Sequence, residues 1–215
     1  MLCELVESLK DPYDPTKNIQ LMSQLCRTPT GALWASLWES KAASSAEILH
    51  LRALTEQPLD LEEIASCTEG TLGHRYFQWL GEYGIPLQDQ LDRLSGKIDQ
   101  PPLYIARLLK THDLHHIVLD IPPTKDGEIM LQGAISALSS SPGPFEALTV
   151  PALPYLAARG HRGAFRAWKK GFDLGKALKG QGGVDPLVIP YEDLWKTQVS
   201  DICSKYNLQV TLHIK

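Results

Sequence analysis

The sequence predicts an all-α fold in which residues 1–215 form a single domain. Apolar residues recur at helical spacing in most segments, and prolines and glycines separate these segments. Only residues 208–215 alternate apolar and polar side chains as a strand does, and a lone terminal strand has no evident partner. A chain of 215 residues, 43% hydrophobic and 21% charged, is long enough to bury one sizeable core.

The first half of the chain contains several predicted helices, at residues 14–27, 28–41, 59–67 and 69–84. The segment 59–67 has Asp60 as its expected N-cap and Glu63 three residues later, which is close to a capping box. Thr71 is the expected cap of the helix that follows, and Gly84 its expected end.

The central predicted helix covers residues 102–119. Pro102 suits its first turn, because the first amides of a helix have no partner within it. Pro122 and Pro123 end the helix, since proline lacks an amide hydrogen and restricts the residue before it. Another helix is expected over residues 127–138.

Composition and charge argue against several classes of protein. The net charge of −4 does not favour a nucleic-acid partner. The four cysteines are far apart, which suits buried thiols in a reducing compartment rather than a zinc site. The N-terminus lacks the features of a signal peptide, and no apolar stretch reaches the roughly 20 residues of a spanning helix. We therefore expect a cytoplasmic protein without a transmembrane helix.

Polar side chains gather on one face of the central helix. With about 100° between successive residues, His112, Asp113 and His116 share one sector about one turn long, whereas His115 points to the side. Two histidines four residues apart on a helix are typical of H-E-x-x-H zinc sites, here with aspartate in place of glutamate. We interpret the pair as ligands of one divalent cation, which Asp113 either joins as a ligand or supports by orienting a neighbour.

A further carboxylate ligand is expected after the proline turn. Glu128 is the best candidate because it lies at the start of the next predicted helix, and Asp120 is the alternative if the central helix extends that far. Such a set suits zinc, iron(II) or manganese, and magnesium less naturally. The alternative to a metal site is an ordinary pairing of carboxylates with histidines near a helix C-terminus.

The spacing of these residues resembles the H-D-x-x-H-x(11)-E signature of the ubiquinone (coenzyme Q) biosynthesis family of the Coq-four type, here His112, Asp113, His116 and Glu128. Residues 70–80 are similar to the family's G-[ST]-L-G-x-x-Y-x-x-[FW]-[LM] element. Residues 186–208 resemble its closing segment, with Tyr191 where tryptophan is frequent. The resemblance covers residues 15–208, but the segment 159–183 matches no family pattern.

The resemblance implies an all-α protein with a divalent metal, most simply zinc, bound by the four signature residues. It implies action on a polyprenyl hydroxybenzoate, whose ring carboxylate is removed with or without hydroxylation at that carbon. The implied partners are a polyprenyl-tailed aromatic or isoprenoid phosphate lipid, other quinone-biosynthesis enzymes, and the inner face of a membrane. Without a leading targeting segment the chain is similar to a bacterial member, and homodimer formation is left open.

Candidate substrate-binding residues lie in the matching elements: Arg75, Tyr76, Tyr104 and Arg107. Arg75 and the backbone amides of the glycine-rich helix start can face an anionic group such as an isoprenoid phosphate. The alternative is that the glycines only form a tight turn.

The segment 159–183 is strongly basic. Residues 151–180 contain seven arginines and lysines but a single acidic residue, and Phe165, Trp168 and Phe172 recur at helical spacing. One interpretation is a mobile or membrane-facing helix on anionic lipid. The other is an amphipathic core helix with a solvated basic face.

Three functions remain open on these patterns. The first is a metal-dependent decarboxylase of a polyprenyl benzoate, peripheral at a membrane. The second is a non-catalytic isoprenoid-lipid-binding scaffold of a quinone-biosynthesis complex. The third is a His-Asp metal phosphohydrolase, which would need further ligands such as His74 and Asp173.

Overall fold

Helices account for the regular structure in the part of the chain that the structure describes. The structure is a computed structural model that describes residues 28–84, 102–139, 150, 153–154, 156–158 and 160–209. Its elements are α3 (Pro29–Ala42), α4 (Ser45–Glu56), α5 (Leu61–Ala65), α6 (Leu72–Glu82), α8 (Leu103–Val118), α9 (Lys125–Leu138), α11 (Ala164–Gly180), η1 (Pro186–Val188), η2 (Tyr191–Asp193) and α12 (Val199–Lys205). These described residues contain no strand, which confirms the all-α prediction. The predicted helix 14–27 lies outside them, as does the predicted strand beyond residue 209.

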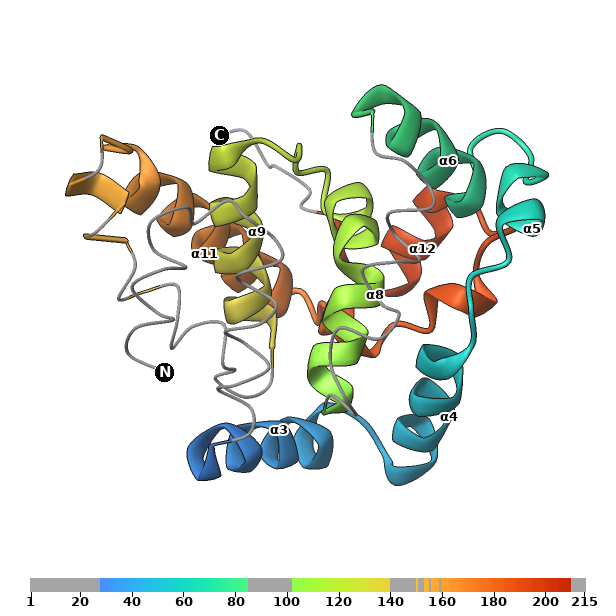
Figure 1. Ribbon diagram of the computed structural model, residues 1–215, viewed down its shortest axis with the longest axis horizontal. Coiled ribbons are helices and arrows are strands. Elements are labelled where there is room, and N and C mark those ends of the chain that lie inside the picture. The colour runs from blue at the N-terminus through green and yellow to red at the C-terminus, as the bar shows by residue number, and fades with distance from the viewer. Residues whose placement is uncertain are drawn as a thin grey trace.

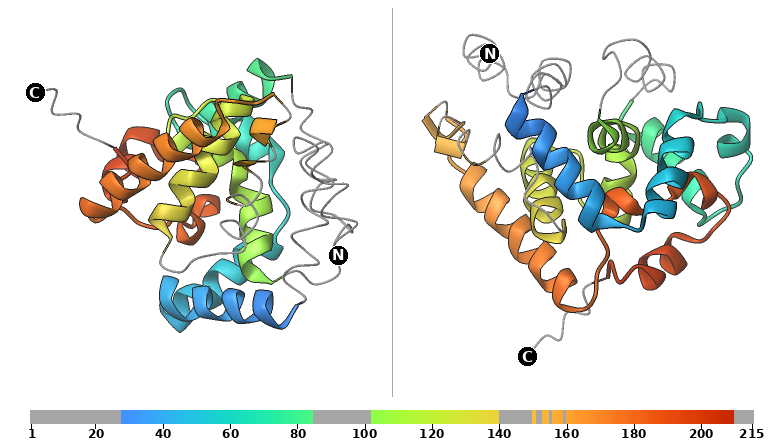
Figure 2. Two further views of the ribbon diagram at one scale, coloured as in Figure 1. Left: turned by 90° about the vertical axis from the view of Figure 1, so that its left-hand side faces the viewer. Right: turned by 90° about the horizontal axis from the view of Figure 1, so that it is seen from below.

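Helix α8 runs through the middle of the molecule (Figure 1). Helices α9 and α11 lie on one side of it, α6 and α12 on the other, and α3 and α4 cross one end (Figures 1 and 2). Because α8 is surrounded, most of its residues are buried, including polar ones such as Arg107, Thr111 and His115. A helix with so many buried polar groups needs specific partners for them.

Local signals explain where several helices begin. Asp60 accepts a hydrogen bond from the Glu63 amide, as the sequence predicts. Helix α4, which has no counterpart among the predicted helices, starts with a full capping box between Ser44 and Glu47. Thr71 precedes α6 but makes no side-chain cap. Instead, the first amides of α6 donate to the carbonyl oxygens of Thr197 and Trp195, at 2.9 Å each, so the C-terminal segment caps this helix.

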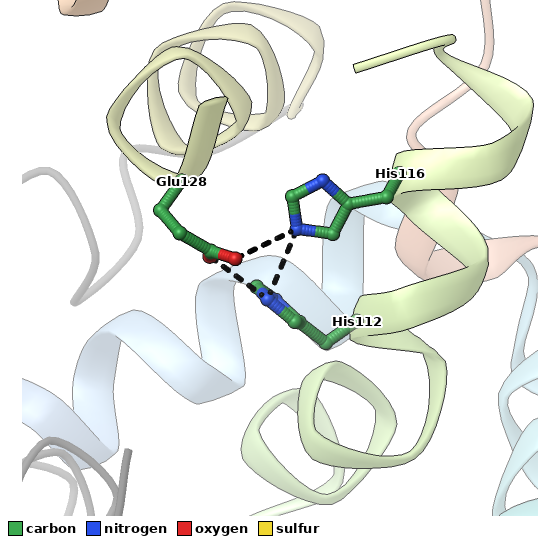
Figure 3. Close-up of side chains that lie close together, drawn as sticks. All are labelled: His112, His116 and Glu128. Carbon is green, nitrogen blue, oxygen red and sulfur yellow. Dashed lines mark hydrogen bonds and ion pairs between the residues drawn. The ribbon is translucent and has the colours of Figure 1, made fainter. Parts of the chain in front are cut away.

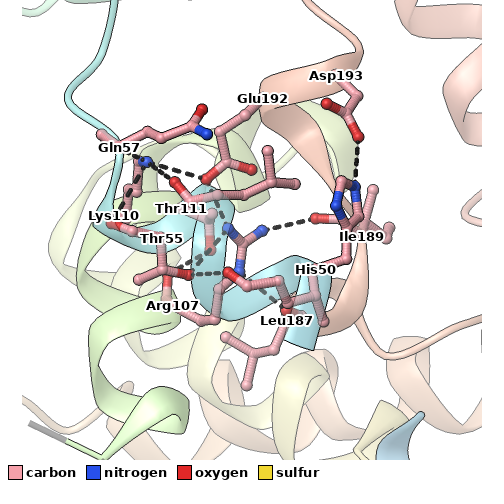
Figure 4. A network of polar contacts seen from close by, with 12 residues as sticks. His50, Thr55, Gln57, Arg107, Lys110, Thr111, Leu187, Ile189, Glu192 and Asp193 are labelled. Atoms are coloured by element: carbon pink, nitrogen blue, oxygen red, sulfur yellow. Dashed lines mark hydrogen bonds and ion pairs between the residues drawn. The ribbon is translucent and has the colours of Figure 1, made fainter. Parts of the chain in front are cut away.

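A buried ionic network anchors α8 to distant segments (Figure 4). The Arg107 guanidinium donates to the carbonyl oxygens of Leu187 (3.3 Å) and Ile189 (2.7 Å), and pairs with Glu192 at 2.6 Å. Lys110 pairs with the same carboxylate at 3.2 Å, and its ammonium donates to Gln57 O and other carbonyl oxygens at the end of α4. These bonds fix the position of α8 relative to α4 and the C-terminal segment.

Helices α9 and α11 touch backbone to backbone. A Cβ atom at Gly171 of α11 would lie 1.8 Å from the carbonyl oxygen of Met130 on α9, so only glycine permits this approach. Ala164 and Ala167, both buried, continue the same face of α11. The small side chains therefore let α11 hold α9 at short range.

Candidate metal centre

His112, His116 and Glu128 meet between α8 and the start of α9 (Figure 3). The Nε2 atoms of the two imidazoles are 3.3 Å apart. His112 Nε2 lies 3.1 Å from Glu128 Oε2, and His116 Nε2 lies 3.2 Å from Glu128 Oε1. We call these three residues the triad.

Helix geometry and a tight turn bring the triad together. The two histidines are one turn apart on α8, so their rings point the same way. Glu128 belongs to the first turn of α9, where Thr124 caps the helix by accepting a hydrogen bond from the Gly127 amide. A Cβ at Gly127 would lie 1.7 Å from the carbonyl oxygen of Pro122. Glycine is needed there because α9 starts directly against the proline turn.

Two neighbours outside the triad orient His116. Its Nδ1 donates to the Ile121 carbonyl oxygen at 2.8 Å, since a carbonyl can only accept, and this bond turns Nε2 towards the triad. Trp79 of α6 stacks on the same ring, with 5.9 Å between centroids. Neither contact was predicted, because no local pattern links α6 or the Ile121 carbonyl to the histidines.

The histidines dominate the electrostatics of Glu128. Burial raises the pKa of this carboxyl group, but the charge of His112 and the hydrogen bonds of both imidazoles outweigh burial and hold the pKa well below its usual range. Glu128 is therefore a carboxylate with two oxygens directed at two ring nitrogens.

The remaining predicted carboxylates lie elsewhere. Asp113 is 6% exposed and outside the group of converging ligand atoms, and its Oδ2 has no hydrogen-bond partner among the described residues. Asp120, the alternative to Glu128, follows the end of α8 at Val118 and is exposed, with a positive φ of 51°. It does not project along the face of the histidines because the helix has already ended.

The triad fits a small divalent cation. Ligands 2.0–2.1 Å from a tetrahedral zinc are about 3.3 Å apart, which is the spacing observed between the triad atoms. Two imidazoles and a carboxylate are a familiar donor set for zinc, and equally for iron(II) or manganese. The fourth signature residue, Asp113, contributes no atom to this group, and its role as a ligand stays a prediction.

Each candidate substrate-binding residue has a described contact with a residue outside the triad. Arg75 is exposed and pairs with Glu82 at 3.1 Å, whereas Tyr76 is buried and stacks on Trp195. Tyr104 packs edge-on against Trp38, and Arg107 is committed to the ionic network. Their role in substrate binding stays a prediction. His74 and Asp173, the additional ligands of a phosphohydrolase, are likewise absent from the converging group.

Comparison with known proteins decides the family. The family model described as Coenzyme Q (ubiquinone) biosynthesis protein Coq4 matches residues 5–211. The chain belongs to the Coq4 family. Its resemblance to that family is thereby confirmed.

Relatives of the Coq4 family share a modest level of identity with the chain. Ubiquinone biosynthesis protein COQ4, mitochondrial, of Mycosarcoma maydis is 23% identical over 115 residues, 52% of this chain and 31% of the relative. The COQ4 homolog, mitochondrial, of Anopheles gambiae is 24% identical over 174 residues, 74% of this chain and 57% of the relative. The chain thus spans less than two thirds of the length of these relatives.

A solved structure shares the Coq4-family fold. The crystal structure of a Nostoc punctiforme protein, described as belonging to ubiquinone biosynthesis, superposes with a TM-score of 0.70 and covers 97% of both chains. At 19% identity this similarity concerns the fold alone. Among the described helices, none is long and apolar enough to cross a bilayer.

Proposed function

We propose that this Coq4-family protein removes the carboxylate from the aromatic ring of a polyprenyl hydroxybenzoate. The observation that carries the proposal is the convergence of His112, His116 and Glu128 at the spacing of cation ligands. The triad would hold one divalent cation, most simply zinc. When bound, the cation supplies positive charge that orients the substrate's carboxylate or phenolate and stabilises negative charge developing on the ring.

The chain's own groups hold the cation, and solvent supplies the proton. In the reaction the bond between the ring carbon and the carboxylate breaks, carbon dioxide leaves, and the electron pair stays on the ring carbon. A proton from water at the solvent-accessible triad then takes the vacated position. Hydroxylation at the same carbon needs an oxidant as well, so the proposed reaction ends with loss of carbon dioxide.

The proposed substrate carries a long isoprenoid tail, so we propose that the protein works peripherally at a membrane that contains it, beside other quinone-biosynthesis enzymes. The triad is reachable from solvent: the side chains of His112 and Glu128 are 29% and 33% exposed. A substrate ring can therefore reach the triad from outside the protein.

The test is release of labelled carbon dioxide from a carboxyl-labelled prenylated hydroxybenzoate by zinc-loaded protein. Glu128→Ala and His116→Ala should abolish release, whereas Asp126→Asn, at an exposed carboxyl two residues from Glu128, should retain it. If the wild type releases nothing, and Glu128→Ala supports quinone production in cells as well as the wild type does, the proposed chemistry is wrong. The protein would then be the non-catalytic scaffold.

A further inference from the structure

Helix α11 presents a basic face to solvent. Its exposed basic residues, with Arg162 just before the helix, are Arg162, Arg166, Lys169, Lys170, Lys176 and Lys179. The one acidic residue on the helix, Asp173, pairs with Lys169. Arg166 and Lys170 have no ion-pair partner among the described residues. The whole chain has a net charge of −4, so the residues outside this basic segment carry a net charge more negative than −4.

An aromatic side chain protrudes from this basic face. Phe165 is 62% exposed, because α11 buries a different face, made of Ala164, Ala167 and Gly171, against α9. Trp168 and Phe172 are half-buried beside it and stack on each other at 4.9 Å. Of the two interpretations of this segment, a purely solvated basic face does not account for an aromatic ring left in water. Helices that lie in a membrane interface combine lysine and arginine residues with protruding aromatic side chains in this way.

The start of α11 lies next to the start of α9, the helix that carries Glu128 of the triad. His161, just before α11, contacts Asp126 at 2.6 Å between Nε2 and Oδ1. Asp126 is two residues before Glu128 in the first turn of α9. Phe165 therefore belongs to a segment that contacts the start of α9, close to Glu128 of the triad.

We propose that the exposed face of α11 docks onto a bilayer containing anionic lipids. Phe165 inserts at the headgroup level, while Arg162, Arg166 and Lys170 face lipid phosphates. The headgroup region of a bilayer offers both anionic phosphates for the basic residues and an apolar layer for Phe165, so lipid is the favoured occupant. The inference deepens the proposed function by naming the surface through which the protein meets the membrane, and it rests on that function only for its biological purpose.

Vesicle flotation of the full chain tests the charge contribution. The wild type should float with equal parts of phosphatidylcholine and phosphatidylglycerol, and much less with phosphatidylcholine alone. Arg166→Gln/Lys170→Gln should weaken partitioning by about 25-fold, since each basic residue at such a surface contributes about fivefold. The control Lys41→Gln/Lys205→Gln removes the same charge from exposed positions on α3 and α12 and should change partitioning by less than about twofold.

Two phenylalanine variants test the contribution of the aromatic ring to vesicle binding. Phe165→Ala should weaken partitioning by about tenfold, as expected for an inserted aromatic ring. Phe77→Ala, which removes a 46% exposed ring from α6, should leave it unchanged. Thermal melts of all variants establish that they are folded.

Several outcomes overturn the docking proposal: equal binding to neutral and anionic vesicles, equal loss in the two double variants, or equal loss in the two phenylalanine variants. Capture of the wild type by heparin without flotation would instead assign the face to an anionic polymer, and also overturns it. Glu128→Ala should float like the wild type. A wild type that floats as expected but releases no carbon dioxide thus counts against the proposed function alone.

Discussion

The indole of Trp79 and the imidazole of His116 are stacked, with 5.9 Å between their centroids and 27° between their planes. Trp79 lies on α6 and His116 on α8, so the contact joins two helices at the triad. A tryptophan this close to a ligand nitrogen reports directly on whatever occupies the triad.

Cobalt(II) bound at the triad should quench the fluorescence of Trp79, because a paramagnetic ion held by His116 lies next to the stacked indole. Saturable quenching is expected for the wild type and for Trp195→Phe, whose indole stacks on Tyr76 instead. Trp79→Phe should lose most of it. Unchanged quenching in Trp79→Phe would place the ion elsewhere.

Removing triad groups should weaken binding of zinc or cobalt in a graded way. Glu128→Gln and His116→Ala should each lower affinity by more than about 100-fold, and Asp113→Asn by about tenfold, as for a group that supports the site without converging on it. Competition with a chelator measures these ratios. Asp126→Asn, at a 67% exposed side chain, should bind like the wild type, and an equal loss there would argue against the triad.

Gly171→Ala should destabilise the protein by about 1–3 kcal/mol, since the new methyl group would overlap the Met130 carbonyl. Gly180→Ala, in the same helix with no atom within 4 Å of the added Cβ, should be neutral or stabilise by up to about 1 kcal/mol. Urea unfolding measures both. Equal effects would mean that the two helices do not touch at Gly171.

Glu192→Gln should cost about 3–5 kcal/mol, because it leaves Arg107 and Lys110 buried without their shared counter-charge. Burial lowers the pKa of Lys110, and Glu192 opposes that shift, so the variant should also release the Lys110 proton more readily. Glu82→Gln, which breaks the exposed pair with Arg75, should cost less than about 1 kcal/mol. Chemical denaturation distinguishes the two cases.

Asp185 should impose a pH dependence on stability. Burial raises the pKa of this carboxyl above its ordinary 3.8, although hydrogen bonds from Trp38 and the Leu187 amide partly oppose the shift. A raised folded pKa means that the stabilising contribution is complete below pH 3.8 and is lost as the pH rises through the folded value. The unfolding free energy of the wild type relative to Asp185→Asn should therefore grow as the pH falls from 7 towards 4. A constant difference would contradict the shift.

Local periodicity was enough to predict much of the fold. The central helix was expected over 102–119 and spans Leu103–Val118, and the helix expected over 28–41 spans Pro29–Ala42. Helix α4 was not predicted, although Ser44 and Glu47 carry the capping-box signal that would have located its start. The helix expected from residue 127 begins at Lys125, because Thr124 caps it.

The site was predictable only where helix geometry determines it. His112 and His116 share a face by spacing alone, whereas Glu128 lies on another helix and was assigned from its turn and from the family signature. The partners of Arg107 are about 80 residues away in sequence, so no local pattern reveals that its charge is used inside the core. Long-range packing of this kind has no short-range signature.

Because distant residues anchor α8, a chain can contain the sequence motif without forming the triad. Both imidazoles keep their place because Arg107, on the same helix, holds carbonyl groups of Leu187 and Ile189. A chain cut ahead of Pro186 would still contain the whole motif, yet α8 would lose every bond of Arg107 to Leu187, Ile189 and Glu192. Searches that score the motif by itself will accept such fragments, so an intact segment from Pro186 to Asp193 is a second criterion for a competent centre.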